Sequence, residues 1–167
     1  QQQLYMAEHD RMTGLLNWQS YSSLLAQLKP ETLSSLGLLV ADINRLRVLN
    51  QEYGHGYGDQ LLHSLASAMK KEFSPAYVFR LDGDSFLAFC QDITYKSFLS
   101  HIHRLLAEVN RQYPGCVAFG WSWDDADISP DRIFNRAQEF LSVSKAEKKG
   151  AAHQDSRVQA IRLQRLQ

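Results

Sequence analysis

The chain of 167 residues fits a single globular domain with a core of ordinary size. Its composition, with 44% hydrophobic and 22% charged residues, excludes a disordered or fibrous protein. Eighteen basic residues balance eighteen acidic ones, so the overall charge gives no argument for a nucleic-acid partner. Cys90 and Cys116 lie in apolar runs without disulfide or zinc spacing, which favours a reducing compartment.

The first third of the chain is expected to contain two helices separated by a turn-rich segment. Residues 1–9 read as an incoming linker helix, and because the chain begins without Met, we expect a domain excised from a longer protein. Residues 10–17 are rich in turn formers, and Asn17 is a suitable N-cap for a helix over residues 18–28. One face of that helix is predicted to be apolar and carries Trp18, Tyr21, Leu24, Leu25 and Leu28.

The middle of the chain predicts a buried strand followed by two helices. The strand covers residues 36–42, a short apolar run bounded by polar residues. Helices are expected over residues 44–53 and 58–73, with Gly54 as the C-cap between them. The predicted apolar side of the first helix carries Leu46, Leu49 and Tyr53, and that of the second carries Leu61, Leu62, Leu65, Ala66 and Met69.

The second half of the chain predicts a hairpin, a helix, a strand and a final helix. Strands over 76–81 and 85–90 flank Asp82-Gly83, which indicates a tight hairpin turn. A helix over 94–113, a strand over 116–121 and a helix over 129–148 with Ser129 as N-cap follow. The order β-α-α-β-β-α-β-α predicts an α+β fold, a mixed, mostly antiparallel central sheet flanked by helices that can cover one face.

Two carboxylates mark the candidate site, because Asp42 ends the first strand and Asp84 lies in the hairpin. If those strands are neighbours, both side chains emerge at one edge of the sheet. With the Ile43 carbonyl, they would suit Mg²⁺ carried by a nucleoside triphosphate. The alternative is purely structural, with Asp42 as a strand-end cap and Asp84 as a turn residue. Spacing alone leaves both readings open.

Three motifs at fixed spacing resemble the GGDEF domain family of bacterial diguanylate cyclases, which has a palm-like nucleotidyl cyclase fold. The segment 10–17, DRMTGLLN, is similar to the family's opening D-x-L-T-G-L-x-N. The segment 42–59, DINRLRVLNQEYGHGYGD, matches D-x-D-x-F-K-x-x-N-D-x-x-G-H-x-x-G-D. The segment 80–86, RLDGDSF, stands in for R-x-G-G-D-E-F.

The resemblance implies roles for individual residues. Asp42, the Ile43 carbonyl and Asp84 would hold Mg²⁺ or Mn²⁺, with Asp84 in the catalytic signature. Asn50 and Asp59 would read the guanine edge of GTP, since an amide and a carboxylate together match its donors and acceptors. The residues expected to face phosphates are Arg47 and Lys145, although the blurred C-terminal motif leaves Lys148 or Lys149 as alternatives. A structural hydrogen-bonding role is expected for His55.

Departures from the family pattern fall in the hairpin. Asp82 replaces the first signature glycine and adds a negative charge beside phosphates. One like-charge contact near ~4 Å costs about 4 kcal/mol at an effective dielectric of 20. Ser85 replaces the signature glutamate, and Asn44 replaces the second aspartate of the first motif. The family's R-x-x-D feedback site is absent, because residues 73–76 read FSPA.

These departures predict a degenerate GGDEF domain without significant cyclase activity, serving as a regulatory or GTP-binding module in cyclic-di-GMP signalling. The alternative is an active cyclase that condenses two GTP molecules with a variant signature. The domain is expected over residues 10–150, with 151–167 as a helical tail or linker. Expected partners are an upstream sensor domain, a downstream phosphodiesterase-type domain and a second copy of the domain. The expected location is cytoplasmic, as a domain of a larger protein that is either free in the cytoplasm or bound to the membrane.

Overall fold

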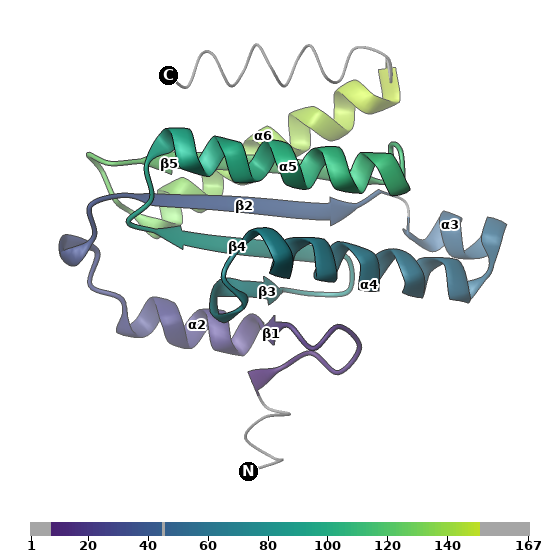
Figure 1. Cartoon of the computed structure of the whole chain (residues 1–167), viewed down its shortest axis with the longest axis horizontal. Coiled ribbons are helices and arrows are strands. Elements are labelled where there is room, and N and C mark those ends of the chain that lie inside the picture. The colour runs from purple at the N-terminus through teal and green to yellow at the C-terminus, as the bar shows by residue number, and fades with distance from the viewer. Residues whose placement is uncertain (1–7, 45, 151–167) are drawn as a thin grey trace.

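The computed structural model describes residues 8–44 and 46–150 (Figure 1). The predicted tail at 151–167 lies outside these residues, as does most of the predicted incoming helix at 1–9. The described elements follow one another in the order that the sequence predicts, with one addition near the N-terminus. No helix within these residues is both long enough and apolar enough to cross a membrane.

A five-stranded sheet forms the centre of the molecule, in the spatial order β1-β3-β4-β2-β5. Its strands are β1 (Leu16–Asn17), β2 (Leu36–Ile43), β3 (Val78–Arg80), β4 (Ser85–Gln91) and β5 (Val117–Asp124). The pair β1–β3 is parallel, and the other three pairs are antiparallel. The expected mixed, mostly antiparallel sheet is confirmed.

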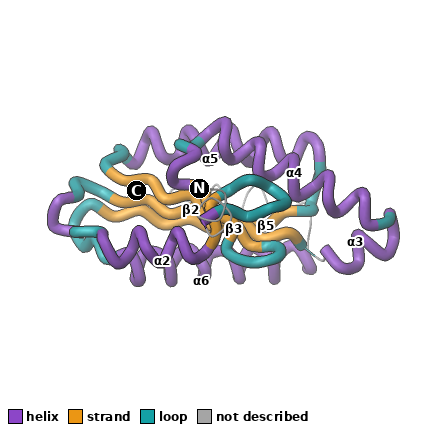
Figure 2. Tube along the Cα trace, turned by 90° about the horizontal axis from the view of Figure 1, so that it is seen from below, coloured by secondary structure: helices purple, strands orange, loops and turns teal. Residues whose placement is uncertain are grey.

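Helices cover both faces of this sheet, which confirms the predicted sheet flanked by helices, although the expectation that they could cover a single face is wrong (Figure 2). One face carries α4 (His55–Glu72) and α5 (Tyr95–Gln112), and the other carries α2 (Trp18–Gln27) and α6 (Pro130–Gly150). The short helix α3 (Leu46–Tyr53) lies beyond the end of β2 (Figure 1). Single 3₁₀ turns occupy Pro30–Thr32 and Pro75–Tyr77.

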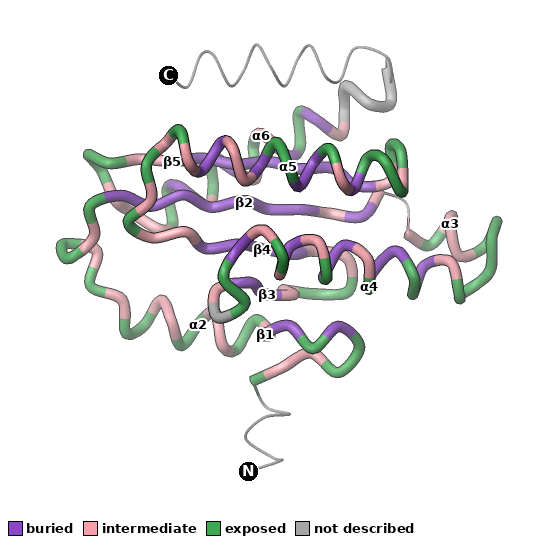
Figure 3. The backbone as a smooth tube through the Cα atoms, in the orientation of Figure 1, coloured by how far each residue is buried: buried purple, intermediate pink, exposed green. Residues whose placement is uncertain are grey.

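Alternation along β2 explains the two-sided arrangement. Leu39, Ala41 and Ile43 belong to the core beneath α4 and α5, whereas Leu38 and Val40 belong to the core beneath α2 and α6. The strand is buried along nearly its whole length between the two helical layers (Figure 3). The same alternation directs the side chain of Asp42 toward the face that α6 covers, which matters for the site.

Helix caps follow the predicted residues. Asn17 accepts a hydrogen bond from the Ser20 N–H, and the Ser129 hydroxyl accepts one from Arg132 N–H. Gly54 directly follows α3, as predicted, and donates its N–H to the Asn50 carbonyl. Its φ of 89° and ψ of 162° suit glycine but differ from the αL conformation of a usual C-cap, and the residue is also the N-cap of α4. The helix that follows begins at His55 instead of residue 58.

Two predicted core aromatics are exposed. Trp18 is 58% exposed and Tyr53 is 63% exposed, so neither belongs to the apolar face assigned to it. Tyr53 instead contacts Tyr57, with ring centroids 4.8 Å apart. The other apolar positions assigned to these two helices do pack against the cores: Tyr21, Leu24, Leu25, Leu28, Leu46 and Leu49.

Candidate active site

The two predicted carboxylates come together where β2 ends and β4 begins. In the antiparallel register, Asp42 stands directly opposite Ser85, and the Ile43 N–H donates to the Asp84 carbonyl at 3.0 Å. Partial burial raises the pKa of Asp84 above its ordinary value, and the negative charges of Asp42 and Asp82 raise it further. The expectation that neighbouring strands would place Asp42 and Asp84 at one edge is confirmed.

Asp42 has different surroundings at its two oxygens. Its Oδ2 accepts a hydrogen bond from the ammonium group of Lys145 on α6. Its Oδ1 is buried and has no hydrogen-bond partner among the described residues. The structure therefore places Lys145 against the predicted metal ligand, and its predicted contact with phosphate stays a prediction.

The β3–β4 hairpin is wider than the tight turn expected at Asp82-Gly83. Neither residue has a positive φ, which a two-residue type I′ turn requires at both positions. Leu81 N–H bonds to the Ser85 carbonyl and closes the loop, while Asp82 Oδ1 accepts from Asp84 N–H at 3.3 Å. This last bond uses a side chain that a glycine at residue 82 would not have.

The predicted guanine-reading residues lie at the α3–α4 junction. Asn50 Oδ1 is buried without a described partner and packs against Gly58, where an added Cβ would lie 1.9 Å from that oxygen. Asp59 follows Gly58 on α4 and is exposed. A glycine is required at residue 58 because the Asn50 side chain fills the space beside its Cα. Their contact with guanine remains a prediction.

Other predicted residues lie at the surface of the same region. Arg47 on α3 and His55 at the start of α4 are exposed. Exposure of His55 gives no support to the structural hydrogen-bonding role expected of it. The side chains of Lys148 and Lys149 fall outside the described ones, so the choice among Lys145, Lys148 and Lys149 for phosphate is not tested.

One contact between two of the motifs was missed by sequence reasoning. Arg80 donates to Asp10 Oδ2 at 3.0 Å and also to the carbonyls of Asp82 and Gly83, at 3.2 and 2.6 Å. The hydroxyl and N–H of Thr13 donate to the same Asp10 oxygen. Both Asp10 and Arg80 belong to the motifs quoted above, and their opposite charges were the available signal for a link between those motifs.

The donors around Asp42 fit a hard divalent cation. They comprise the two carboxylates of Asp42 and Asp84 and the strand-end carbonyl of Ile43, and the buried Asp42 Oδ1 is an acceptor without a described partner. Among the described residues, no group of three or more His, Cys, Asp or Glu side chains is arranged to hold a metal ion. Mg²⁺ commonly takes one or two carboxylates and completes its shell with phosphate oxygens and water, so this smaller donor set suits it.

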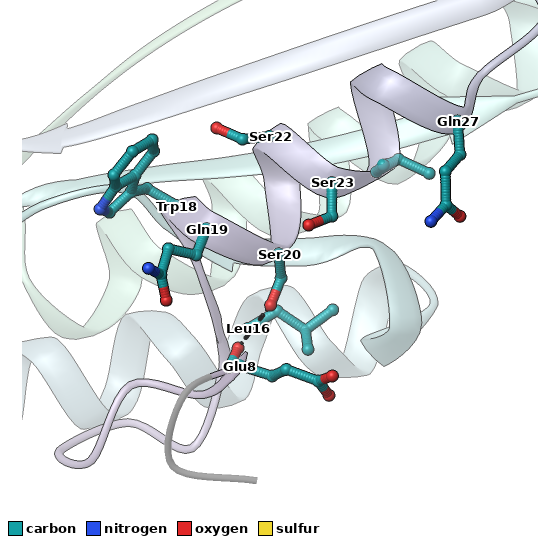
Figure 4. A pocket seen from close by; sticks show the side chains of 9 residues that line it. Glu8, Leu16, Trp18, Gln19, Ser20, Ser22, Ser23 and Gln27 are labelled. Carbon is teal, nitrogen blue, oxygen red and sulfur yellow. Dashed lines mark hydrogen bonds between the residues drawn. The ribbon is translucent and has the colours of Figure 1, made fainter. Parts of the chain in front are cut away.

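A groove of about 650 Å³ runs along α2, away from these residues (Figure 4). Its lining includes Trp18, Gln19 and Ser23, and the Ser20 hydroxyl bonds to the Glu8 carbonyl at one end. None of the predicted site residues lines it. The exposed Trp18 side chain lies in this groove, which is not part of the candidate active site.

Comparison with known proteins supports the resemblance carried by the motifs. A family model described as "Diguanylate cyclase, GGDEF domain" matches residues 7–151. The probable diguanylate cyclase DgcE of Escherichia coli strain K12 is 33% identical over 110 residues, which make up 64% of this chain and 10% of that protein. The chain thus spans about a tenth of that relative's length.

Solved structures share the fold. The coiled coil and GGDEF domain of DgcB from Caulobacter crescentus, in complex with c-di-GMP, align with a TM-score of 0.75 at 22% identity. The alignment covers 87% of this chain and 84% of that one. An S helix-GGDEF-EAL segment of Vibrio cholerae LapD, bound to c-di-GMP, gives a TM-score of 0.74 at 17% identity, covering 89% and 36%.

Proposed function

The chain belongs to the diguanylate cyclase GGDEF-domain family, and on that premise we propose that it is a catalytically impaired member. In this proposal it serves as a regulatory or GTP-binding module in cyclic-di-GMP signalling. Mg²⁺ or Mn²⁺, when bound with the nucleotide, would be held by Asp42, Asp84 and the Ile43 carbonyl and would neutralise phosphate charge.

The observation that carries the proposal is the register of β2 and β4, in which Ser85 faces Asp42. Residues directly opposite in antiparallel strands have Cβ atoms about 5 Å apart. The family glutamate at this position would thus bring a carboxylate beside Asp42, and Ser85 brings a neutral hydroxyl. The charge that is lost lies where the predicted metal and phosphates would be organised.

Asp82 supports the same conclusion from the other side of the hairpin. Its carboxylate caps the Asp84 N–H, which places a negative charge beside the loop backbone that phosphates would approach. The neighbouring charge of Asp82 is also one reason for the raised pKa of Asp84. Repulsion between this carboxylate and phosphate oxygens weakens binding at the reacting end of the nucleotide.

The guanine-reading half of the predicted pocket is intact in sequence. Asn50 and Asp59 are retained, and Gly58 leaves space for the Asn50 amide. A domain with a retained base-recognition half and an altered phosphate half suits nucleotide binding without turnover. The arrangement in DgcB and LapD, where GGDEF domains adjoin a coiled coil or an EAL domain, supports a parent protein with an upstream sensor and a downstream phosphodiesterase-type domain.

The test is a pair of measurements on the purified domain at high concentration, with GTP and Mg²⁺ or Mn²⁺. Calorimetry should give GTP binding that Asp59→Ala abolishes, while chromatography should show no steady accumulation of cyclic di-GMP. The double variant Asp82→Gly, Ser85→Glu should gain product formation. Accumulation by the unaltered domain that disappears in Asp84→Ala would make it an active cyclase and refute the proposal.

A further inference from the structure

Lys145 holds a position that a bound cation would otherwise take. Its ammonium group donates to Asp42 Oδ2 although the two residues are 103 positions apart in the chain. The Asp42 side chain is 15% exposed and that of Lys145 is 37% exposed, so the pair is only partly open to solvent. A charge-assisted hydrogen bond of this kind is stronger than a pair at the open surface.

The close approach of α6 to the sheet brings Lys145 to this position. An added Cβ at Gly120 on β5 would lie 2.2 Å from the Ala137 carbonyl oxygen and 2.5 Å from the Leu141 nitrogen, so the helix backbone rests directly on that glycine. Lys145 follows Leu141 by one helical turn and therefore projects from the same side of α6. Asp42 lies on the matching face of β2, because it alternates with Leu38 and Val40.

Lys145 contacts only one of the two carboxylate oxygens of Asp42. Asp42 Oδ1 is buried and has no hydrogen-bond partner among the described residues. A buried, unpaired carboxylate oxygen is costly, and in native proteins it usually has a water molecule or an ion beside it. Lys145 thus neutralises one side of a carboxylate whose other side remains available to a hard cation.

We propose that Lys145 is a built-in counterion for Asp42, and that a divalent cation binds the Asp42–Asp84 edge in competition with the Lys145 ammonium group. The inference rests on the proposed function in taking Asp42 and Asp84 as cation ligands. In the absence of nucleotide, the ammonium group lowers the affinity of this edge for metal, because a cation must compete with it for the Asp42 carboxylate. Lys145 therefore lowers the affinity of this edge for divalent cations through its contact with Asp42.

The test measures Mn²⁺ binding to the domain without nucleotide, from the electron paramagnetic resonance signal of free Mn²⁺. Lys145→Gln should bind Mn²⁺ roughly tenfold more tightly than the unaltered domain, since it removes a charge-assisted hydrogen bond that opposes binding. Adding Asp42→Asn to Lys145→Gln should remove the gain. No gain in Lys145→Gln, including no measurable binding at all, would overturn the proposal.

Arg136→Gln is the matched control. Arg136 lies on the same helix and pairs with Asp124 at the opposite end of β5, with 3.2 Å between nitrogen and oxygen. The control removes one positive charge and one ion pair without touching Asp42, and its Mn²⁺ affinity should equal that of the unaltered domain. An equal gain in both variants would reduce the effect to overall charge and refute the counterion role. The Mn²⁺ titration contains no GTP. Formation of cyclic di-GMP in the separate GTP experiment would therefore refute the proposed function without changing the result of this titration.

Discussion

Arg80 and Asp10, 70 positions apart in the chain, form an ion pair of 3.0 Å that joins the N-terminal turn to the β3–β4 hairpin. The two side chains are only 12% and 23% exposed. Because the same guanidinium also binds the carbonyls of Asp82 and Gly83, one residue fixes the hairpin both to its own strand and to a distant segment. Four predictions follow from this and related contacts.

Loss of Arg80 should loosen the hairpin and lower stability. Arg80→Ala leaves Asp10 without its guanidinium and two loop carbonyls without donors, so we expect the free energy of unfolding to fall by about 2–3 kcal/mol. Urea denaturation of the variant and the unaltered domain measures this difference in the free energy of unfolding. Arg132→Ala is the control, because its pair with Asp127 is 70% and 50% exposed, and it should change stability by less than about 1 kcal/mol. Equal effects would contradict the structural role.

The Asp84 carboxylate should give stability a specific pH dependence. Its raised pKa means that the folded state favours the protonated form, so its stabilising contribution is present below the ordinary value of 3.8 and is lost as the pH rises through the folded value. Without metal, Asp84→Asn should therefore raise the Tm at pH 7, and the gain should vanish in acid. Thermal melts of Asp84→Asn and the unaltered domain across a range of pH measure this difference in Tm. An unchanged Tm of Asp84→Asn at pH 7 would contradict the prediction.

Asp10→Asn supplies a control of opposite sign. Partial burial raises the pKa of Asp10, but hydrogen bonds from Thr13 and the guanidinium of Arg80 together hold it below 3.8. Its contribution to stability is therefore present above 3.8 and lost as the pH falls through the folded value. Asp10→Asn should lower the Tm at pH 7, and its difference from the unaltered domain should shrink in acid.

Gly58→Ala should displace Asn50. The new methyl group would overlap Asn50 Oδ1, so we expect a loss of about 1–3 kcal/mol in stability together with weaker GTP binding. Gly56→Ala on the same helix is the control, because an added Cβ there meets nothing within 4 Å. It should leave stability unchanged or slightly raised. Retained GTP affinity in a folded Gly58→Ala domain would argue against base recognition by Asn50.

Gly120→Ala should push α6 away from β5. The atoms in its way are the backbone carbonyl of Ala137 and the backbone nitrogen of Leu141, which have no rotamer to change, so a loss of about 2–3 kcal/mol is expected in urea denaturation. Gly83→Ala, where the added Cβ meets nothing within 4 Å, should have a much smaller effect. A stable Gly120→Ala domain would mean that the helix shifts at little cost.

Sequence reasoning predicted most elements because their signals are local. Short apolar runs and helical spacing located β2, β4, α4 and α5, and the two carboxylates at the sheet edge followed from strand order. The hydrophobic pattern identifies the apolar side of a helix but does not say which face of a sheet it covers, so the second helical layer was missed. The strand β1 has two residues and carries too short a pattern to detect.

The remaining errors depend on tertiary contacts. Periodicity counts Trp18 and Tyr53 as apolar, although both rings end at the surface. The Asp82-Gly83 pair favours a tight turn, but Arg80 holds both of their carbonyls in a wider loop. To predict the contact between Lys145 and Asp42, one must know how closely α6 packs on β5. A glycine in a strand does not indicate that distance by itself.

The contact at Gly120 also determines where α6 places Lys145. The helix backbone touches the sheet there, Lys145 lies on the far side of that contact, and the helix continues to Gly150. Any change in how closely α6 packs on β5 at this glycine would also change the distance between the Lys145 ammonium group and Asp42. The packing of one strand glycine therefore sets the charge environment of a carboxylate on a different strand.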